Sequence, residues 1–342
     1  MTVYLIRRFA TMLLTLAVIS ALVFIIINLP PGNYLSNQIA EMRYSGEASG
    51  IAKAEEMVKQ YSLDKPIWQQ YFIWLGVMPG PDGFTGLLQG DFGWSFELGR
   101  PVAEVVGETA WLTVLVNLSS LLFVYVVALP LGTIAAVRAN TWIDYAASLI
   151  GYIGLATPNF LLALIMLFYG ARYFGIPIGG LMGHEYEGAE MSWGKMQSIL
   201  IHLIVPTIVI GTSAAAAVMR RLRANLMDEL NKPYVETARA KGVPPVTRII
   251  RYPLRMALNP FVADIGNLAP QLVSGSVMIS VVMSLPTIGP ILLQALKSQD
   301  IFMAGFILLF VSILTLVGML ISDILLTLLD PRIRLSSARR EA

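Results

Sequence analysis

The first candidates for chemistry are acidic residues at short spacing, since two carboxylates can act as a general acid and a general base. Two such pairs lie in one polar stretch, Glu55 with Glu56 and Glu104 with Glu108. No histidine, serine or metal-ligand partner accompanies either pair. We therefore expect these carboxylates to lie on solvated helix faces and not in a catalytic site.

A second cluster combines His184 with Glu185, Glu187 and Glu190 and superficially resembles a metal site. A single histidine in a glycine-containing loop offers poor ligand geometry, so a solvated loop is the favoured interpretation. The chain has no cysteine, which excludes disulfides, thiol metal sites and a cysteine nucleophile.

Nucleotide binding by a phosphate loop is also excluded. Gly194-Lys195 is followed by Met196, and no glycine lies five positions before Gly194. No Ser-His-Asp set, zinc pattern or dinucleotide fingerprint occurs. The basic residues flank apolar runs and are not interleaved with a stacking platform, which argues against a nucleic-acid partner. We expect a protein that is not an enzyme and holds no cofactor or metal.

One polar face lies inside an apolar run. Asp264, Asn267 and Gln271 follow one another at i, i+3 and i+7, and Ser274 lies three residues further on, so the four share one helix face. Acids inside membrane segments are costly and often functional. This face therefore lines a translocation path or makes a buried polar contact between helices. For Asp323, near the end of another run, the structural alternative is favoured.

The composition places these residues in a membrane protein. The chain is 56% hydrophobic and only 13% charged, against about 25% charged in a soluble domain. Six apolar runs are long enough to span a bilayer, which takes about 20 residues. They cover roughly residues 9–29, 109–137, 145–171, 196–219, 257–283 and 301–329. No signal-peptide cleavage site follows the first run, so we expect it to stay as a span.

Four of the six runs contain a proline, and small residues recur beside them. A proline in a span kinks the helix and frees a carbonyl, which neighbouring helices must satisfy. Small residues such as Gly151 and Gly154 permit close helix contacts. Kinked, closely packed helices suit the wall of a pathway. Pro130, Pro158, Pro206 and Pro270 each lie in one of these four runs.

Basic residues fix the expected orientation. By the positive-inside rule, the side that holds most of the lysine and arginine faces the cytoplasm. That side carries 16 of the 24 basic residues, whereas the first outer loop alone carries ten acids. Both termini and the 220–255 loop are then cytoplasmic. We divide the chain into an N-terminal span (1–30), an extracytoplasmic region (31–108), a five-helix core (109–330) and a cytoplasmic tail (331–342).

A charged island, residues 233–255, interrupts the apolar runs. Pro233 suits the first turn of a helix, with Asn231 as a cap. Gly242 can adopt the left-handed conformation that ends a helix, and Pro244-Pro245 prevent its continuation. The predicted helix is about 13 Å long, too short to cross a hydrocarbon core of about 30 Å. Its alanines, Ala238 and Ala240, would let a partner's backbone approach closely.

The residues Glu236-Thr237-Ala238, with Gly242 six positions after the glutamate, resemble the Glu-Ala-Ala...Gly loop of ABC-importer permeases. The longer string Glu-Thr-Ala-Arg-Ala-Lys-Gly resembles the branch that imports peptides, nickel and some oligosaccharides. Two further strings, Gly90-Asp91-Phe92-Gly93-Trp94-Ser95 and Asp330-Pro331-Arg332, are also similar to that branch. Tyr252 and Met256 depart from it, since His and Asn are usual there.

The resemblance implies an all-α, polytopic protein with six transmembrane helices, a type I ABC-importer permease fold and a large outer loop after the first span. It implies that the protein lies in a bacterial or archaeal cytoplasmic (inner) membrane, where it contacts membrane lipid. The implied partners are a second homologous permease subunit, two cytoplasmic ATPase subunits that bind the ATP, and an extracytoplasmic substrate-binding protein. Glu236, Thr237, Ala238 and Gly242 are then the ATPase-coupling residues.

Other function classes and substrates stay open at this point. A secondary transporter driven by an ion gradient predicts paired midplane charges and an inverted repeat, which the single Asp264 and the 220–255 loop argue against. An intramembrane enzyme would need a catalytic dyad that the sequence lacks. Peptide and oligosaccharide are equally favoured as cargo. Nickel is disfavoured, because no histidine or cysteine set lines a span.

Overall fold

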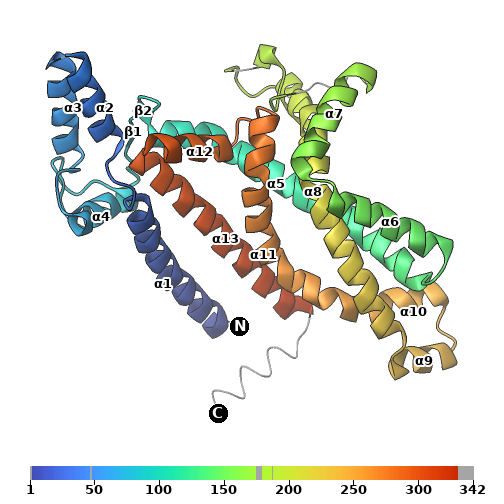
Figure 1. Ribbon diagram of the computed structural model, residues 1–342. Helices are drawn as coiled ribbons and strands as arrows, with labels where there is room; N and C mark the ends of the chain where they lie inside the picture. The colour runs from blue at the N-terminus through green and yellow to red at the C-terminus, as the bar shows by residue number, and fades with distance from the viewer. Residues whose placement is uncertain (1, 47, 175–178, 187, 330–342) are drawn as a thin grey trace. The chain divides into compact units, whose positions relative to one another are not determined.

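The computed structural model describes residues 2–46, 48–174, 179–186 and 188–329, and the chain forms two compact units (Figure 1). The N-terminal unit comprises residues 2–112 and 287–314, and the central unit comprises residues 113–286 and the chain from 315 onward. Helices α5 and α13 each contribute to both units. The predicted cytoplasmic tail, 331–342, lies outside the described residues.

Short helices and one small hairpin dominate the N-terminal unit. Its elements are α1 (Thr2–Ile27), α2 (Tyr34–Ser45), α3 (Ala48–Gln60), α4 (Ile67–Leu75), η1 (Leu87–Gln89), β1 (Trp94–Ser95), β2 (Arg100–Pro101), the start of α5 (Val102–Val137), α12 (Ile288–Ser298) and the start of α13 (Ile301–Leu329). The two strands are antiparallel, with Trp94 opposite Pro101 and Ser95 opposite Arg100. This hairpin is a small departure from a purely helical chain.

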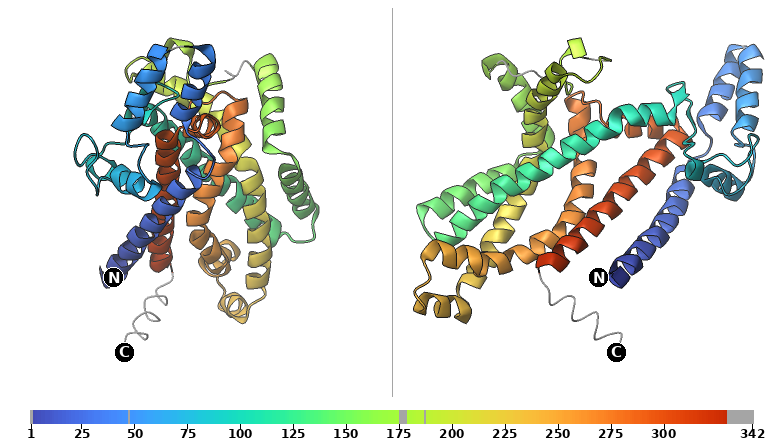
Figure 2. Two further views of the ribbon diagram at one scale, coloured as in Figure 1. Left: turned by 60° about the vertical axis from the view of Figure 1, so that its left-hand side comes forward. Right: turned by 180° about the vertical axis from the view of Figure 1, so that it is seen from behind.

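Long helices make up the central unit. Its elements are the rest of α5 and α13, with α6 (Trp142–Ala156), α7 (Asn159–Phe174), η2 (His184–Tyr186), α8 (Trp193–Leu230), α9 (Pro233–Ala240), α10 (Pro245–Arg251) and α11 (Pro253–Val282). Helix α8 packs against α6, α7 and α11. In both views of Figure 2, α9 and α10 lie at the C-terminal end of α8.

Among the described residues, four helices are long and apolar enough to cross a membrane: α1, α5, α8 and α13. A fifth span forms if α6 and α7 are counted as one broken span, because they bend by 99° at Thr157-Pro158. The predicted run 145–171 is therefore not one continuous helix, and Pro158 marks the break. Helix α11 is not among these candidate spans, so the count of six stays a prediction.

Helices α5 and α8 are longer than the runs that predicted them. Helix α5 begins at Val102, seven residues before the predicted run, and α8 continues 11 residues past Met219. Pro130 and Pro206 lie inside these helices without ending them. The first eleven residues of the predicted 220–255 loop are consequently the last turns of α8.

The predicted close contacts of small residues are confirmed between α6 and α8. A Cβ added at Gly151 would lie 2.7 Å from Met219 Cε, and one at Gly154 would lie 3.1 Å from Thr212 Cγ2. Met219 is itself buried, in a core that includes Leu222 and Phe261. Because these two positions of α6 carry no side chain, the backbone of α6 can lie close to the side chains of α8.

Candidate functional site

Helix α9 begins where the sequence predicted. Pro233 is its first helical residue, where the missing N–H of proline costs no hydrogen bond. Lys232 occupies the cap position, without a side-chain cap bond. The expected cap, Asn231, instead ends α8, where its Nδ2 donates to Met227 O at 3.0 Å. Helix α9 is therefore joined to α8 by a single turn.

The end of α9 also follows the prediction. Gly242 adopts φ +74°, a left-handed conformation that most residues avoid. Its N–H donates to Arg239 O at 3.0 Å, and the N–H of Val243 donates to Ala238 O at 3.2 Å. These bonds satisfy carbonyls that the helix end leaves open. Pro244 then precedes α10, which starts at Pro245.

The two faces of α9 differ sharply. Val235 and Ala238 are buried within this chain, at 8% and 5% exposure. Glu236, Thr237 and Arg239 are exposed on the other face. Ala238 therefore seats α9 on its own unit and offers little surface to a partner. Ala240 is exposed, so its small side chain leaves room for a partner's backbone to approach α9, as expected.

A short polar contact links α9 to α8. The hydroxyl of Tyr234 donates to the carboxylate of Glu229 near the end of α8. Burial and the hydrogen bond to Glu229 raise the pKa of Tyr234 above its usual value, so the hydroxyl stays a donor at neutral pH. The contact ties the first turn of α9 to the end of α8, and the buried Val235 packs the helix against its own unit. The exposed face of α9 is thus presented as a rigid surface.

Three arginines near the end of α8 connect it to its neighbours. The Arg223 guanidinium donates to both oxygens of Asp144 at the start of α6, at 2.5 and 2.7 Å. Arg221 pairs with Asp264 of α11 at 2.5 Å. Arg220 lies over the ring of Tyr152 in α6, 5.6 Å from its centre. The end of α8 is thus tied to both α6 and α11.

Sequence reasoning missed the Asp144–Arg223 pair. It treated the α8 arginines only as topology signals and gave Asp144 no role. The signal that would have found the pair is an acid at the start of an apolar helix, since a carboxylate there needs a cation when it is buried. Asp144 is 1% exposed. No spacing in the sequence relates residues 79 positions apart.

The predicted polar face of α11 is only partly described. Asp264 contacts Arg221 with a quarter of its side chain exposed, so it takes part in a helix–helix contact. Gln271 is exposed. The side chains of Asn267 and Ser274 lie outside the described residues, and a path role for the four stays a prediction.

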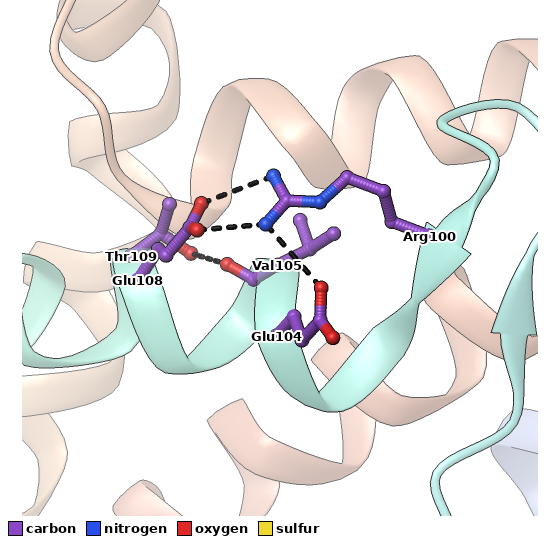
Figure 3. Close-up of polar contacts among 5 residues, drawn as sticks. All are labelled: Arg100, Glu104, Val105, Glu108 and Thr109. Atoms are coloured by element: carbon purple, nitrogen blue, oxygen red, sulfur yellow. Dashed lines mark hydrogen bonds and ion pairs between the residues drawn. The ribbon is translucent and has the colours of Figure 1, made fainter. Parts of the chain in front are cut away.

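The acidic clusters have structural explanations. Arg100 of β2 reaches Glu108 at 2.7 Å and Glu104 at 3.5 Å on the first turns of α5 (Figure 3). Glu55 pairs at 3.8 Å with Arg43 on the surface. Within the described part of the chain, no three histidine or acidic side chains gather to hold a metal ion. Glu187 of the His184 cluster lies outside that part.

Comparisons with known proteins cover almost the whole chain. Residues 1–128 match the family described as "Binding-prot-dependent transport system membrane comp, N-term". Residues 128–335 match "Binding-protein-dependent transport system inner membrane component". The oligopeptide transport system permease protein AppB of Bacillus subtilis is 31% identical over 335 residues, which cover 97% of this chain and 99% of AppB.

Two further relatives are similar over nearly the whole chain, and one solved structure has a similar fold. The dipeptide permease DppB of Lactococcus lactis is 30% identical, covering 98% of this chain and 100% of DppB. The glutathione permease GsiC of Escherichia coli is 29% identical, covering 97% and 98%. A chain of the inward-facing MetNI methionine ABC transporter superposes with a TM-score of 0.50 at 20% identity, covering 66% of this chain and 96% of that one.

These matches settle the fold and the class of protein. The superposition shows a type I ABC-importer permease fold, and the ion-gradient alternative is disfavoured. Such a permease spans the membrane several times, depends on a substrate-binding protein, and leaves ATP hydrolysis to partner subunits. The chain belongs to the family of binding-protein-dependent transport system inner membrane components, as a permease subunit of an ABC importer.

Proposed function

We propose that α9 is the element through which partner ATPases move this permease. One observation carries the proposal: α9 exposes Glu236, Thr237 and Arg239 while its apolar residues Val235 and Ala238 are buried in its own unit. Because α9 is anchored in this way, it can transmit a displacement to the rest of its unit without itself detaching from that unit. Glu236 and Thr237 are the contact residues, Ala238 seats the helix, and Gly242 sets the direction in which the chain leaves it.

The route from α9 to the membrane helices is short. Helix α9 follows directly on α8, and α10 leads directly into α11. The Arg223–Asp144 and Arg221–Asp264 pairs tie α8 to α6 and α11. A displacement of α9 therefore acts on three membrane helices together. The mechanism this supports is alternating access, in which ATP bound elsewhere supplies the work.

The proposed assembly contains a second, homologous permease subunit, two cytoplasmic ATPase subunits and an extracytoplasmic binding protein. The arginines and lysines around α9 favour a cytoplasmic position for this loop and for both termini. ATP is bound by the partners, and the permease holds no cofactor of its own. The path lies at the interface of the two permeases, with Asp264, Asn267, Gln271 and Ser274 as candidate lining residues.

We propose peptides as the cargo. The three relatives described above are named for oligopeptide, dipeptide and glutathione transport, and each aligns with nearly this whole chain. A peptide presents backbone amides, which polar uncharged side chains such as Gln271 can bind without a compensating charge. These names favour peptides over oligosaccharides, which the sequence alone left equally favoured.

The test is transport by the reconstituted importer. We expect Glu236→Lys to insert normally and to accept the loaded binding protein, but to transport a labelled dipeptide at least tenfold more slowly, with weakened ATPase association. Glu41→Lys, which reverses an exposed charge on α2, is the matched control and should transport normally. Normal transport by Glu236→Lys would show that this face of α9 is not the contact.

A further inference from the structure

Helix α4 exposes apolar side chains in the region between the α1 and α5 spans. None of its nine residues, Ile67–Leu75, is charged. Ile67, Trp68 and Phe72 are nevertheless 51%, 56% and 40% exposed. Trp68 and Phe72 are four residues apart, so they lie on the same face of the helix. Exposed apolar faces of this kind mark a contact with another protein or with a membrane.

A different face of α4 packs on the last turns of α1. The Tyr71 hydroxyl lies 2.8 Å from Ser20 Oγ, at hydrogen-bond distance. The Phe24 ring packs against the rings of Tyr71 and Trp74, with centres 5.5 and 5.3 Å apart. Ser20, Phe24 and Trp74 are buried. Helix α4 and the C-terminal part of α1 therefore form one packed structure (Figure 1).

These contacts set the depth of α4 in the bilayer. Helix α1 is a candidate span over Ile6–Ile27, in which Arg8 is the last charged residue and after which Asn28 follows. At about 1.5 Å per residue, a hydrocarbon core of about 30 Å that begins after Arg8 ends near Asn28. Ser20 and Phe24 precede Asn28 by roughly 12 and 6 Å along the helix. The α4 side chains that contact them therefore reach into the border of the hydrocarbon core.

At this depth the unit is surrounded by lipid. On the same turns of α1, Leu22, Ile25 and Ile26 are exposed, as expected for the lipid-facing side of a span. The exposed face of α4 lies at the same level and continues this lipid-facing surface. Tryptophan is enriched at the headgroup level of membranes, because its ring is apolar and its N–H is polar. An uncharged helix that exposes Trp68 fits this environment better than it fits water.

We propose that α4 is a membrane-interface anchor, which lies in the headgroup region and inserts Ile67, Trp68 and Phe72 among the ester groups of the lipids. The Trp68 N–H donates there to a lipid carbonyl or phosphate oxygen. Because α4 has no charged residue, the contact does not depend on the charge of the headgroups. Interfacial tryptophans set the tilt and rotation of a span, so α4 also holds α1 in position.

The test places single cysteines in this cysteine-free chain and labels each with a small fluorophore. Trp68→Cys and Phe72→Cys report on α4. The controls are Val18→Cys, near the middle of the α1 span, and Tyr44→Cys, whose position is 95% exposed on α2. In Figure 1, α2 extends from the C-terminal end of α1 in the direction away from its N-terminus. The chain is measured in nanodiscs, both alone and in the importer with partner subunits that lack reactive cysteine.

Two quenchers distinguish lipid from water. A lipid that carries a spin label near its headgroup should quench both α4 positions at least twofold more than a lipid labelled near the end of its acyl chain. Val18→Cys should show the reverse order. Aqueous iodide should quench Tyr44→Cys at least threefold more than either α4 position. Replacing half of the neutral phosphatidylcholine with anionic phosphatidylglycerol should leave the lipid quenching at α4 unchanged.

Three results would overturn the proposal. Iodide quenching at α4 as strong as at Tyr44→Cys would place the helix in water. Lipid quenching that disappears on assembly would show that a partner subunit covers this face. Lipid quenching that requires the anionic lipid would assign the contact to charge. Because Trp68 and Phe72 are exposed, neither substitution opens the core, and an unchanged melting temperature verifies the fold. None of these measurements depends on α9, so the anchor and the coupling proposal fail separately.

Discussion

Asp144 accepts hydrogen bonds from Arg223 through both of its carboxylate oxygens, at 2.5 and 2.7 Å, and is itself 1% exposed. The pair joins the first turn of α6 to the last turns of α8, and α9 is the next helix along the chain. A two-point contact of this kind restricts sliding and rotation between the helices. The same pair therefore sets both the stability of the central unit and the stiffness of the route from α9.

Asp144→Asn should destabilise the chain strongly. It leaves the Arg223 guanidinium half-buried without its counter-charge, and breaking such a pair costs about 3–5 kcal/mol when both groups are buried. Arg223 is 27% exposed, which places the expected loss near the lower end of that range. Thermal unfolding in detergent measures it.

The control is Arg43→Gln, which removes an ion pair whose side chains are 67% and 55% exposed. Exposed pairs contribute about 0–1 kcal/mol, so little change is expected. Equal losses for the two variants would mean that Asp144–Arg223 does not anchor α6 to α8.

Gly242→Val should impair coupling through the backbone alone. A Cβ at this position would meet no heavy atom within 4 Å, but the residue has φ +74°. A β-branched residue in that conformation costs about 1–2 kcal/mol, and relief of the strain would turn the chain leaving α9. We expect slower peptide transport with normal membrane insertion.

Gly242→Asn is the matched variant, because asparagine tolerates the left-handed region better than most residues. It should retain most of the transport that Gly242→Val loses. If the two variants were equally impaired, the conformation of residue 242 would not be the cause.

Asp300 should make the N-terminal unit sensitive to pH. This carboxylate precedes α13, is 0% exposed, and accepts from Ser95 Oγ at 2.7 Å and from the backbone N–H groups of Glu97 and Met303. Burial nevertheless raises its pKa above the usual 3.8. Between 3.8 and the raised value the folded state binds more protons than the unfolded state, so the free energy of unfolding falls as pH rises.

The measurement is the melting temperature from pH 3.5 to 7 for the natural chain and for Asp300→Asn, which does not titrate. The difference between the two curves should change across the acidic part of this range and level off above it. A constant difference would show that Asp300 has an unshifted pKa.

The sequence predicted local structure well where local chemistry decides it. Pro233 and Gly242 bound α9 as expected, since a proline and a left-handed glycine act within a few residues. The bend at Pro158 was indicated only as a kink, because the proline fixes a break but not its angle. Helix α8 exceeded its apolar run, since a helix need not end where the hydrocarbon does.

Contacts between distant residues were beyond the sequence. Nothing near Asp144 points to Arg223, and nothing near Asp300 points to Ser95, because the fold brings these residues together over 79 and 205 positions. The burial of Ala238 was missed for a related reason. Helical spacing gives the faces of α9, but only the surrounding unit decides which face is covered.

Site-directed cross-linking tests the coupling claim most directly, and the absence of native cysteine makes the chain suitable for it. Glu236→Cys places a thiol on the exposed face of α9, and Ala238→Cys places one on its buried face. In the assembled importer, a short thiol-reactive cross-linker should join the Glu236→Cys chain to an ATPase subunit, and should join the Ala238→Cys chain much less. A Glu236→Cys chain that assembles but forms no cross-link to the ATPase would contradict the account.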